Sequence, residues 1–276
     1  MNDSTKSNIA GIGTGVIQTI LFHPTDRALY LHMINKNKLF CTANWTNPYH
    51  GISNSLFSKC INYGYYFTIL EKCTNVAKIY LTPITHNEFI QSFAIGATVG
   101  GTTSIINNPI SIVKYIAWST NDPLSRITKQ MYNTHGLKAF YKGLGSTFHR
   151  DSIFTTIYSF MKPHTKHIAK NSNVSYPKAL EFILNTTVTF VATVISSPLN
   201  YSRNMQYKAA MDMRLPGIIR ILRDLEKDVI KKRGIMNKFN YTMIRLGVGW
   251  GTLRTAVGMG CGQFIYDTIY EQCEKI

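Results

Sequence analysis

The sequence is poor in acidic residues and has no paired cysteines. Asp and Glu number 14 against 30 for Lys and Arg, so the net charge is +16 although only 16% of residues are charged. The five cysteines are odd in number and lack any C-x-x-C spacing, which indicates free thiols and excludes a disulfide framework. This excess of base predicts an anionic partner, which could be nucleic acid, a membrane surface or a small solute.

Several kinds of chemistry lack their sequence signatures. We find no Gly-rich phosphate loop and no spacing of Ser, His and Asp that is typical of a triad, so we expect no enzyme activity and no cofactor. His164 and His167 form an isolated H-x-x-H without a second ligand pair, so no metal site is expected. The N-terminus resembles neither a secretory signal nor a transit peptide, which predicts that any membrane address lies within the chain.

The mean hydropathy of −0.06 is low for apolar membrane helices but is compatible with helices that line a wet cavity. Proline, in contrast, is placed regularly. Pro24, Pro109 and Pro198 each follow an apolar segment at separations of 85 and 89 residues, which indicates an internal repeat. We predict that each proline ends or kinks a helix.

Small residues and glycines keep the same register. Gly11 and Gly15 precede Pro24 as Gly96 and Gly100 precede Pro109, and residues four apart share a helix face that lets two helices pack closely. The third unit has Asn185 and Thr189 at these offsets. Downstream, Gly51, Gly143 and Gly247 each open a second segment of roughly 20–25 mainly apolar residues, about the length that crosses a bilayer.

Each unit is therefore predicted to consist of a helix, a polar link and a second helix. We predict a single transmembrane domain, 1–276, with repeats at about 8–80, 88–170 and 177–276. The third link, Pro216 to Gly234, has Ile218, Ile221 and Leu225 at helical spacing and a basic polar face. Such a helix suits an anionic membrane surface, and the alternative is a surface helix packed on a protein core.

Three proline-marked repeats in a basic chain of this length resemble the mitochondrial carrier family, from about residue 9 to 271. The most specific stretch is HGLKAFYKG, residues 135–143, which is similar to an acidic-Gly, aromatic, basic-Gly motif of the family apart from its histidine. The resemblance implies an all-α membrane protein with six transmembrane helices in three pseudo-symmetric repeats around a central cavity.

The family's signature, P-x-[DE]-x-x-[KR] in each repeat, is incomplete in every copy here. In the family, the acid of one repeat pairs with the base of the next and closes the cavity on the matrix side. Because two of three charge pairs are missing, we predict a weakly closed matrix gate. The implied gate positions are Asp26 with Lys114, Ser111 with Arg203, and Asn200 opposite Leu29.

A second network in the family, [FY]-[DE]-x-x-[KR], closes the cytoplasmic side. Counting from the repeat glycines places Glu71, Lys166 and Asp267 in this gate, and only Glu71 with Lys166 keeps both charges. Each gate is therefore expected to retain one pair, which joins the first repeat to the second.

The family holds its substrate with residues seven and eight places past each repeat glycine. The same count predicts a substrate site at Lys59, Arg150, Asp151 and Arg254. A charge in the middle of a membrane helix persists only when it faces a cavity, a partner or a ligand. The alternatives are a snorkelling lysine for Lys59 and a charged turn for Arg150 and Asp151.

Three bases suit a multiply charged anion, because arginine can grip phosphate or carboxylate with two hydrogen bonds. We therefore predict a transporter of a small anionic metabolite, with a nucleotide such as ATP or ADP first, exchanged across the mitochondrial inner membrane by a monomer in contact with lipid. Arg150 followed by Asp151 resembles the amino-acid carriers, so an amino acid is the alternative substrate.

A soluble, basic nucleic-acid-binding protein is the alternative of another class, but it leaves the proline and glycine register unexplained. We expect no nucleic-acid partner. The incomplete motifs also fit a virulence factor, a carrier that a pathogen encodes for the mitochondria of its host.

Overall fold

Helix is the only regular secondary structure in the part of the chain that the computed structural model describes, which is residues 3–35, 38–80, 85, 87–172, 177–212 and 215–274. Six helices of 25–33 residues are α1 (Asp3–Asn35), α3 (Ile52–Tyr80), α4 (Glu88–Thr120), α6 (Leu144–Asn171), α7 (Pro177–Lys208) and α10 (Trp250–Glu274). The shorter ones are α2 (Thr42–Trp45), α5 (Leu124–His135), the 3-10 helix η1 (Gly136–Tyr141), α8 (Ile218–Ile230) and α9 (Ile235–Leu246).

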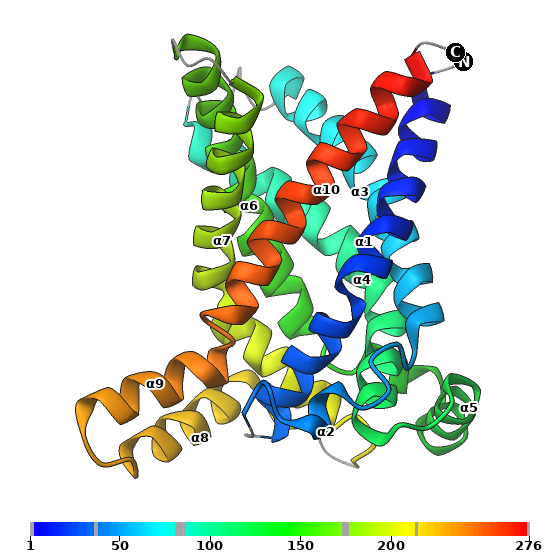
Figure 1. The fold of residues 1–276 in the computed structure, drawn as a ribbon, viewed down its shortest axis with the longest axis vertical. Helices are drawn as coiled ribbons and strands as arrows, with labels where there is room; N and C mark the ends of the chain where they lie inside the picture. The colour runs from blue at the N-terminus through cyan, green and yellow to red at the C-terminus, as the bar shows by residue number, and fades with distance from the viewer. Residues whose placement is uncertain are drawn as a thin grey trace.

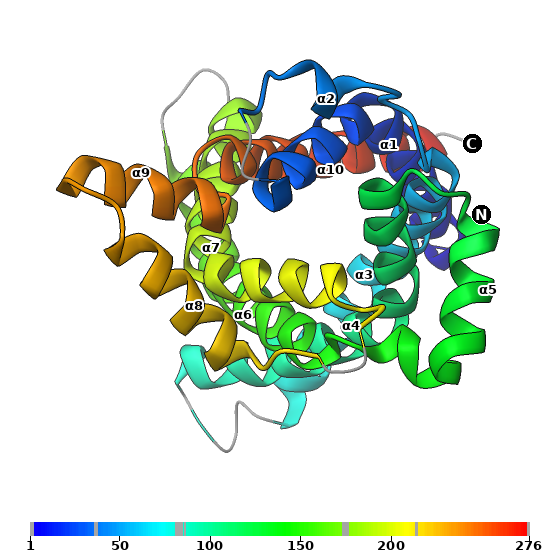
Figure 2. The same ribbon diagram turned by 90° about the horizontal axis from the view of Figure 1, so that it is seen from below.

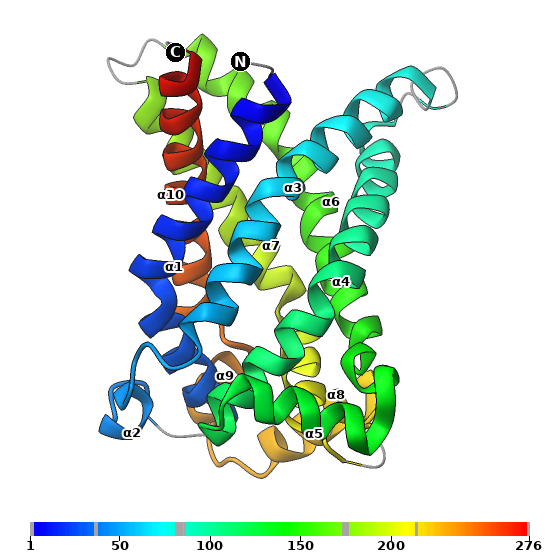
Figure 3. The ribbon, with the colours of Figure 1, turned by 90° about the vertical axis from the view of Figure 1, so that its right-hand side faces the viewer.

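The six long helices form a closed ring. Each contacts the next along the chain, from α1 to α3, α4, α6, α7 and α10, and α10 returns to α1 (Figures 1 and 2). The two chain termini lie at one end of the ring, and α2, α5, α8 and α9 lie at the other, which we call the link end (Figure 3). The all-helical fold expected from the sequence is confirmed.

The prolines lie inside long helices rather than at their ends. Helix α1 continues past Pro24 to Asn35, and α4 and α7 likewise continue past Pro109 and Pro198. None of the three helices ends at its proline, and the predicted kinks at these positions stay a prediction. A proline removes one backbone donor and crowds the preceding turn, but packing of the second half against the link-end core compensates for this cost.

The small residues bring helices into close contact. A Cβ atom added at Gly100 would lie 2.7 Å from the Ser152 Cα on α6, and one added at Gly15 would lie 2.8 Å from the backbone of Cys60 on α3. Only glycine permits these approaches without displacing a backbone, so the predicted tight packing is confirmed for these two helix pairs.

The three repeat glycines occupy backbone conformations that favour glycine. Gly51, Gly143 and Gly247 have φ values of +73°, +82° and +71°, in the left-handed region. Helices α3 and α6 begin at the next residue, and α10 begins at Trp250. The sequence register therefore located the start of each second helix to within three residues.

Two of the long helices, Glu88–Thr120 and Ala179–Lys208, are apolar enough over their described residues to cross a membrane by length and composition. The other long helices carry more polar side chains. On α1, for example, Thr14, Gln18 and His23 are all buried. Polar residues on inward faces lower the average hydropathy of a helix even where its outward face is apolar.

Three cations connect elements of the link end by hydrogen bonds to oxygen atoms of the backbone and of neutral side chains, and of these Arg27 and Arg245 are buried while Lys142 is half-buried. Arg27 on α1 donates to the Thr46 carbonyl at 2.9 Å and to Asn121 Oδ1, the C-cap of α4, at 2.7 Å. Lys142, just before α6, donates to the Ala210 carbonyl beyond the end of α7 at 2.7 Å. Burial lowers the pKa of Lys142. A cation at a helix C-terminus satisfies its free carbonyls and its dipole.

Arg245, near the end of α9, makes the third tie. Its guanidinium donates to the Met33 carbonyl on α1 and to the Tyr201 hydroxyl on α7 at 2.9 Å, and it lies over the Tyr201 ring. Together, the three cations connect the first link to the end of α4, the second link to the end of α7, and the third link to α1.

The predicted helix of the third link is present as α8, but its apolar stripe faces protein. Ile221 and Leu225 are buried in a cluster with Tyr30, Leu31 and Tyr201 from α1 and α7. The alternative of a helix packed on a core is therefore the correct one for this stripe. Helix α9, which the sequence interpretation did not foresee, follows it in a hairpin.

Candidate substrate site

Three charged side chains from three helices meet inside the ring. Asp26 Oδ2 on α1 lies 2.7 Å from Arg254 Nη2 on α10 and 3.3 Å from Lys59 Nζ on α3. The side chains of Asp26, Arg254 and Lys59 are 28%, 13% and 20% exposed, so the group is shielded yet reachable. Because two cations share one carboxylate, the group keeps a net positive charge for an anion.

Neighbouring contacts orient the two cations. Lys59 Nζ also donates to the Gln18 carbonyl at 3.3 Å, and the guanidinium of Arg254 lies 4.2 Å from the centre of the Phe22 ring. The Nε of Arg254 is buried without a hydrogen-bond partner. Because this atom has almost no accessible surface, an acceptor would reach it only after the side chain moves.

Asp26 does not pair with Lys114, as the family's gate pattern implied. Lys114 Nζ instead lies 4.8 Å from the Tyr115 ring centre and 5.1 Å from that of Trp118. The physical reason is competition, since Arg254 and Lys59 approach Asp26 from two sides, while the aromatic faces beside Lys114 stabilise its charge. In this structure Asp26 therefore contacts two residues of the predicted substrate site, and its assignment to the matrix gate stays a prediction.

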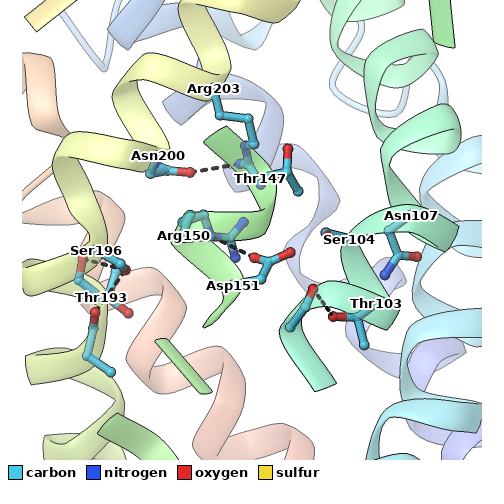
Figure 4. Close-up of polar contacts among 12 residues, drawn as sticks. Thr103, Ser104, Asn107, Thr147, Arg150, Asp151, Thr193, Ser196, Asn200 and Arg203 are labelled. Carbon is cyan, nitrogen blue, oxygen red and sulfur yellow. Dashed lines mark hydrogen bonds and ion pairs between the residues drawn. The ribbon is translucent and has the colours of Figure 1, made fainter. Parts of the chain in front are cut away.

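Arg150 and Asp151 form the second charged group, on α6. Arg150 Nε lies 3.1 Å from Asp151 Oδ1, and both side chains are largely shielded. Figure 4 shows this pair between α7 and α4, with Asp151 directed toward the α4 side chains that include Ser104. The two adjacent residues neutralise one another, so this group can receive an ammonium at the acid or an anion at the base.

Arg203 lies deeper toward the link end and is bonded within α7. Its Nη2 donates to Asn200 Oδ1 at 2.8 Å and to the Tyr115 hydroxyl at 3.4 Å (Figure 4). The predicted hydrogen bond to Ser111 is not formed. Asn200 is one turn from Arg203 on the same helix, so it reaches the guanidinium more readily than a residue on α4 does.

Aromatic rings close the link end of the ring where ion pairs were expected. The ring centres of Tyr30 on α1 and Tyr115 on α4 are 4.6 Å apart, and those of Tyr115 and Tyr207 on α7 are 5.4 Å apart. Trp118 packs edge-on against Tyr115, and Arg203 lies over Tyr115 and Tyr207. We call Tyr30, Tyr115, Trp118 and Tyr207 the aromatic closure. It joins α1, α4 and α7.

Comparisons with known proteins agree with this architecture. Residues 85–173 match the family described as mitochondrial carrier protein. The chain is 23% identical over 248 residues to a mitochondrial glycine transporter of Vanderwaltozyma polyspora, over 81% of this chain and 72% of that protein. These matches support the identification of the chain as a divergent member of the mitochondrial carrier family.

Two Arabidopsis thaliana carriers match shorter parts of the chain. A probable mitochondrial adenine nucleotide transporter is 23% identical over 56% of this chain and 43% of its own length. A mitochondrial dicarboxylate/tricarboxylate transporter is 24% identical over 65% of this chain and 55% of its own length. The chain thus aligns with about half the length of these two carriers, and the printed substrates of the three relatives differ.

The cytoplasmic gate predicted for this carrier is described only in part. The side chains of Glu71 and Lys166 lie outside the described residues. Asp267 is exposed near the C-terminus of α10, where Gln263 Nε2 donates to its Oδ1 at 2.8 Å. Its assignment to the cytoplasmic gate stays a prediction.

Sequence reasoning missed the aromatic closure, although the register contained a signal for it. Tyr30 and Tyr115 each stand six residues after their repeat proline, and Trp118 and Tyr207 each stand nine residues after theirs. Each offset is shared by two of the three prolines, and the two offsets differ by about one helical turn, so these aromatic residues are expected at similar depths in the ring. The family signature consists of charged positions and does not include these aromatic ones, so the resemblance did not point to them.

Proposed function

We propose that this carrier transports a small organic anion across the mitochondrial inner membrane, and that a nucleotide such as ATP or ADP is its substrate. The observation that carries the proposal is the convergence of Arg254 and Lys59 on Asp26 inside the ring. Two cations that share one acid retain attraction for a phosphate or carboxylate group. Their partial exposure makes them accessible to solute.

The charge of the interior favours a multiply charged substrate. Lys59, Lys114, Arg150, Arg203 and Arg254 supply five positive charges, and Asp26 and Asp151 supply two negative ones, which leaves a net charge of +3. A nucleoside triphosphate carries several negative charges and matches this excess better than a monoanionic amino acid does. The serine, threonine and asparagine side chains of α4 and α7 in Figure 4 add neutral donors around the same space.

We infer that all six long helices cross the membrane and that the three helix pairs are repeats of one transmembrane domain. Each long helix has 25–33 residues, and at 1.5 Å per residue about 20 residues cross a hydrocarbon core. Four of the six fall below the hydropathy of a lone spanning helix because their polar faces point into the ring. We propose that the carrier acts as a monomer, since one chain closes the ring.

The transport cycle that we propose is alternating access. In this structure, the aromatic closure holds α1, α4 and α7 together at the link end, which corresponds to the matrix side in the family. A substrate that binds more tightly to the state in which neither end is fully closed lowers the barrier between the two closed states. Such a cycle needs no covalent chemistry, which is consistent with a transporter rather than an enzyme.

An amino acid is the second candidate, because of Arg150 and Asp151. An amino acid could insert between these side chains, with its carboxylate at the base and its ammonium at the acid. The relatives include both a probable adenine nucleotide transporter and a glycine transporter, so similarity alone does not distinguish a nucleotide substrate from an amino-acid substrate. Origin in a pathogen stays a prediction that rests on the incomplete motifs.

The test is uptake of labelled ATP, aspartate and arginine by liposomes that contain the purified carrier, with internal ATP present or absent. We expect ATP uptake, faster when ATP is also inside, which is the mark of exchange. Arg254→Ala should abolish uptake, whereas Arg126→Ala, which changes an exposed arginine on α5, should leave it intact. Uptake of an amino acid without ATP would reverse the order of the two candidates.

A further inference from the structure

Helices α8 and α9 form a hairpin that projects sideways from the link end of the ring. Figures 1 and 2 show both helices extending away from the bundle, with α9 on the side of α8 nearer to the long helices. The inward face of α9 is fixed to the ring through Arg245, which bonds to α1 and α7. The hairpin is therefore attached to the ring by specific contacts at the end of α9.

The outward face of α9 is apolar and uncovered. Ile235, Met236 and Phe239 are 88%, 69% and 55% exposed, and at 100° per residue they fall within one arc of about 100°. Asn237 and Tyr241 lie on the opposite side. Three large apolar side chains on one exposed face are costly in water, which marks the face as a contact surface.

The tip of the hairpin is strongly basic. Lys231, Lys232 and Arg233 are consecutive and exposed between α8 and α9, and none forms an ion pair with a carboxylate among the described residues. The ammonium of Lys232 lies 4.8 Å over the Tyr241 ring. Cations beside an apolar helix face match the two layers of a membrane surface, with anionic headgroups outside and acyl chains within.

Exposed apolar residues at the start of α10 lie next to the hairpin. Trp250 and Leu253, at the start of α10, are exposed just beyond α9, and Phe40 packs edge-on against Trp250 at 6.0 Å. Tryptophan at the end of a membrane-spanning helix is typical of the membrane–water interface. The apolar face of α9 therefore lies beside the level at which the proposed membrane region begins.

We propose that α9 is an interfacial anchor, whose face of Ile235, Met236 and Phe239 inserts into the link-end leaflet while Lys231, Lys232 and Arg233 bind anionic phospholipid headgroups. This inference rests on the proposed membrane position of the carrier. The anchor holds the third link against the bilayer and, through Arg245, fixes α1 and α7 relative to the membrane surface. It takes the place that the sequence interpretation gave to α8, whose stripe is packed on protein.

The test measures the depth of single fluorescent labels in the full-length carrier. In a chain whose five cysteines are replaced by serine, one new cysteine is placed by Met236→Cys on the apolar face or by Asn237→Cys on the opposite face. A third variant, Ile105→Cys, labels α4, one of the helices apolar enough to cross a membrane. Each is reconstituted in vesicles of phosphatidylcholine with or without phosphatidylglycerol and quenched by nitroxide on the lipid chains or by iodide in water.

We expect lipid nitroxide to quench the label at position 236 severalfold more than that at 237, and iodide to show the reverse order. Phosphatidylglycerol should deepen the label at 236, and the triple change of Lys231, Lys232 and Arg233 to Gln should abolish that gain. Equal quenching at 236 and 237, with strong lipid quenching at 105, would overturn the anchor while leaving the membrane position intact. Shielding of 236 from both quenchers would assign the face to a protein surface instead.

A label at position 105 that iodide quenches and lipid nitroxide does not would overturn the membrane position itself, and with it both proposals. Retention of the phosphatidylglycerol effect in the triple variant would overturn the headgroup part alone. Each readout is a fluorescence measurement on folded carrier and needs no knowledge of the transported substrate.

Discussion

Asp26→Asn tests whether Asp26 acts through its contacts with Arg254 and Lys59, as in the structure, or through the gate pairing that its sequence motif implies. In the structure, the Asp26 carboxylate occupies Arg254 at 2.7 Å and Lys59 at 3.3 Å, so an anionic substrate must displace it to bind both cations. Asparagine keeps the shape of the side chain and removes its charge. The net charge of the group rises from +1 to +2.

The size of the effect follows from the two contacts. A hydrogen bond to a charged group contributes about 1.5–3 kcal/mol when well shielded, and an exposed ion pair about 0–1 kcal/mol. Because these side chains are partly exposed, we expect Asp26 to make the free energy of substrate binding less favourable by about 1–2 kcal/mol. Its removal should strengthen binding of ATP by about 5–30-fold, since 1–2 kcal/mol corresponds to that factor.

The assay is the initial rate of ATP uptake into liposomes at a series of ATP concentrations, together with the shift in melting temperature that ATP gives in detergent. We expect a lower KM and a larger shift for Asp26→Asn, and no change for Asp122→Asn, an exposed acid at the link end. A gate role would instead leave KM unchanged and raise the leak of small solutes. An unchanged or higher KM with an increased leak would therefore refute the reasoning.

Three further changes test other parts of the structure. Tyr115→Ala removes the central ring of the aromatic closure and should raise the leak of a small trapped dye from proteoliposomes. The control Tyr132→Ala, on α5, should not raise it. Equal leak in the two variants would argue against the closure. Arg245→Met should lower the melting temperature, because charge-assisted bonds to α1 and α7 of about 1.5–3 kcal/mol are lost. Gly100→Ala should destabilise the carrier by about 1–3 kcal/mol in thermal unfolding, since its Cβ would collide with α6, while Gly145→Ala, with open space at its Cβ, should be neutral.

The arrangement of the long helices was predictable because it depends on backbone chemistry that leaves a clear trace in sequence. Gly51 and Gly143 need left-handed φ values, and Gly100 must let α6 approach closely. Each requirement is met by one residue type at a fixed offset. Counting from these positions also identified Lys59 and Arg254, which do meet inside the ring.

The pairing of charges was not predictable by the same counting. A motif gives the depth of a side chain in the ring but not which of several neighbours it selects at that depth. Asp26 had three cations within electrostatic reach, Arg254, Lys59 and Lys114, and aromatic faces beside Lys114 decided the outcome. Helix α9 escaped prediction for a related reason, since its apolar residues form no long run.

The replacement of ion pairs by rings changes how the link end can open. An ion pair between helices costs desolvation of both charges when it forms, and that cost is returned when the pair separates into water. Stacked rings such as Tyr115 and Tyr207 instead lose apolar contact on separation, and no charge is left unpaired. The cation over them, Arg203, is bonded to Asn200 on its own helix, so separation of the helices does not require this bond to break. In the proposed cycle, opening is therefore opposed mainly by exposure of aromatic surface, and Asp26, which is not paired with Lys114 in this structure, is placed to compete with an anionic substrate for Arg254.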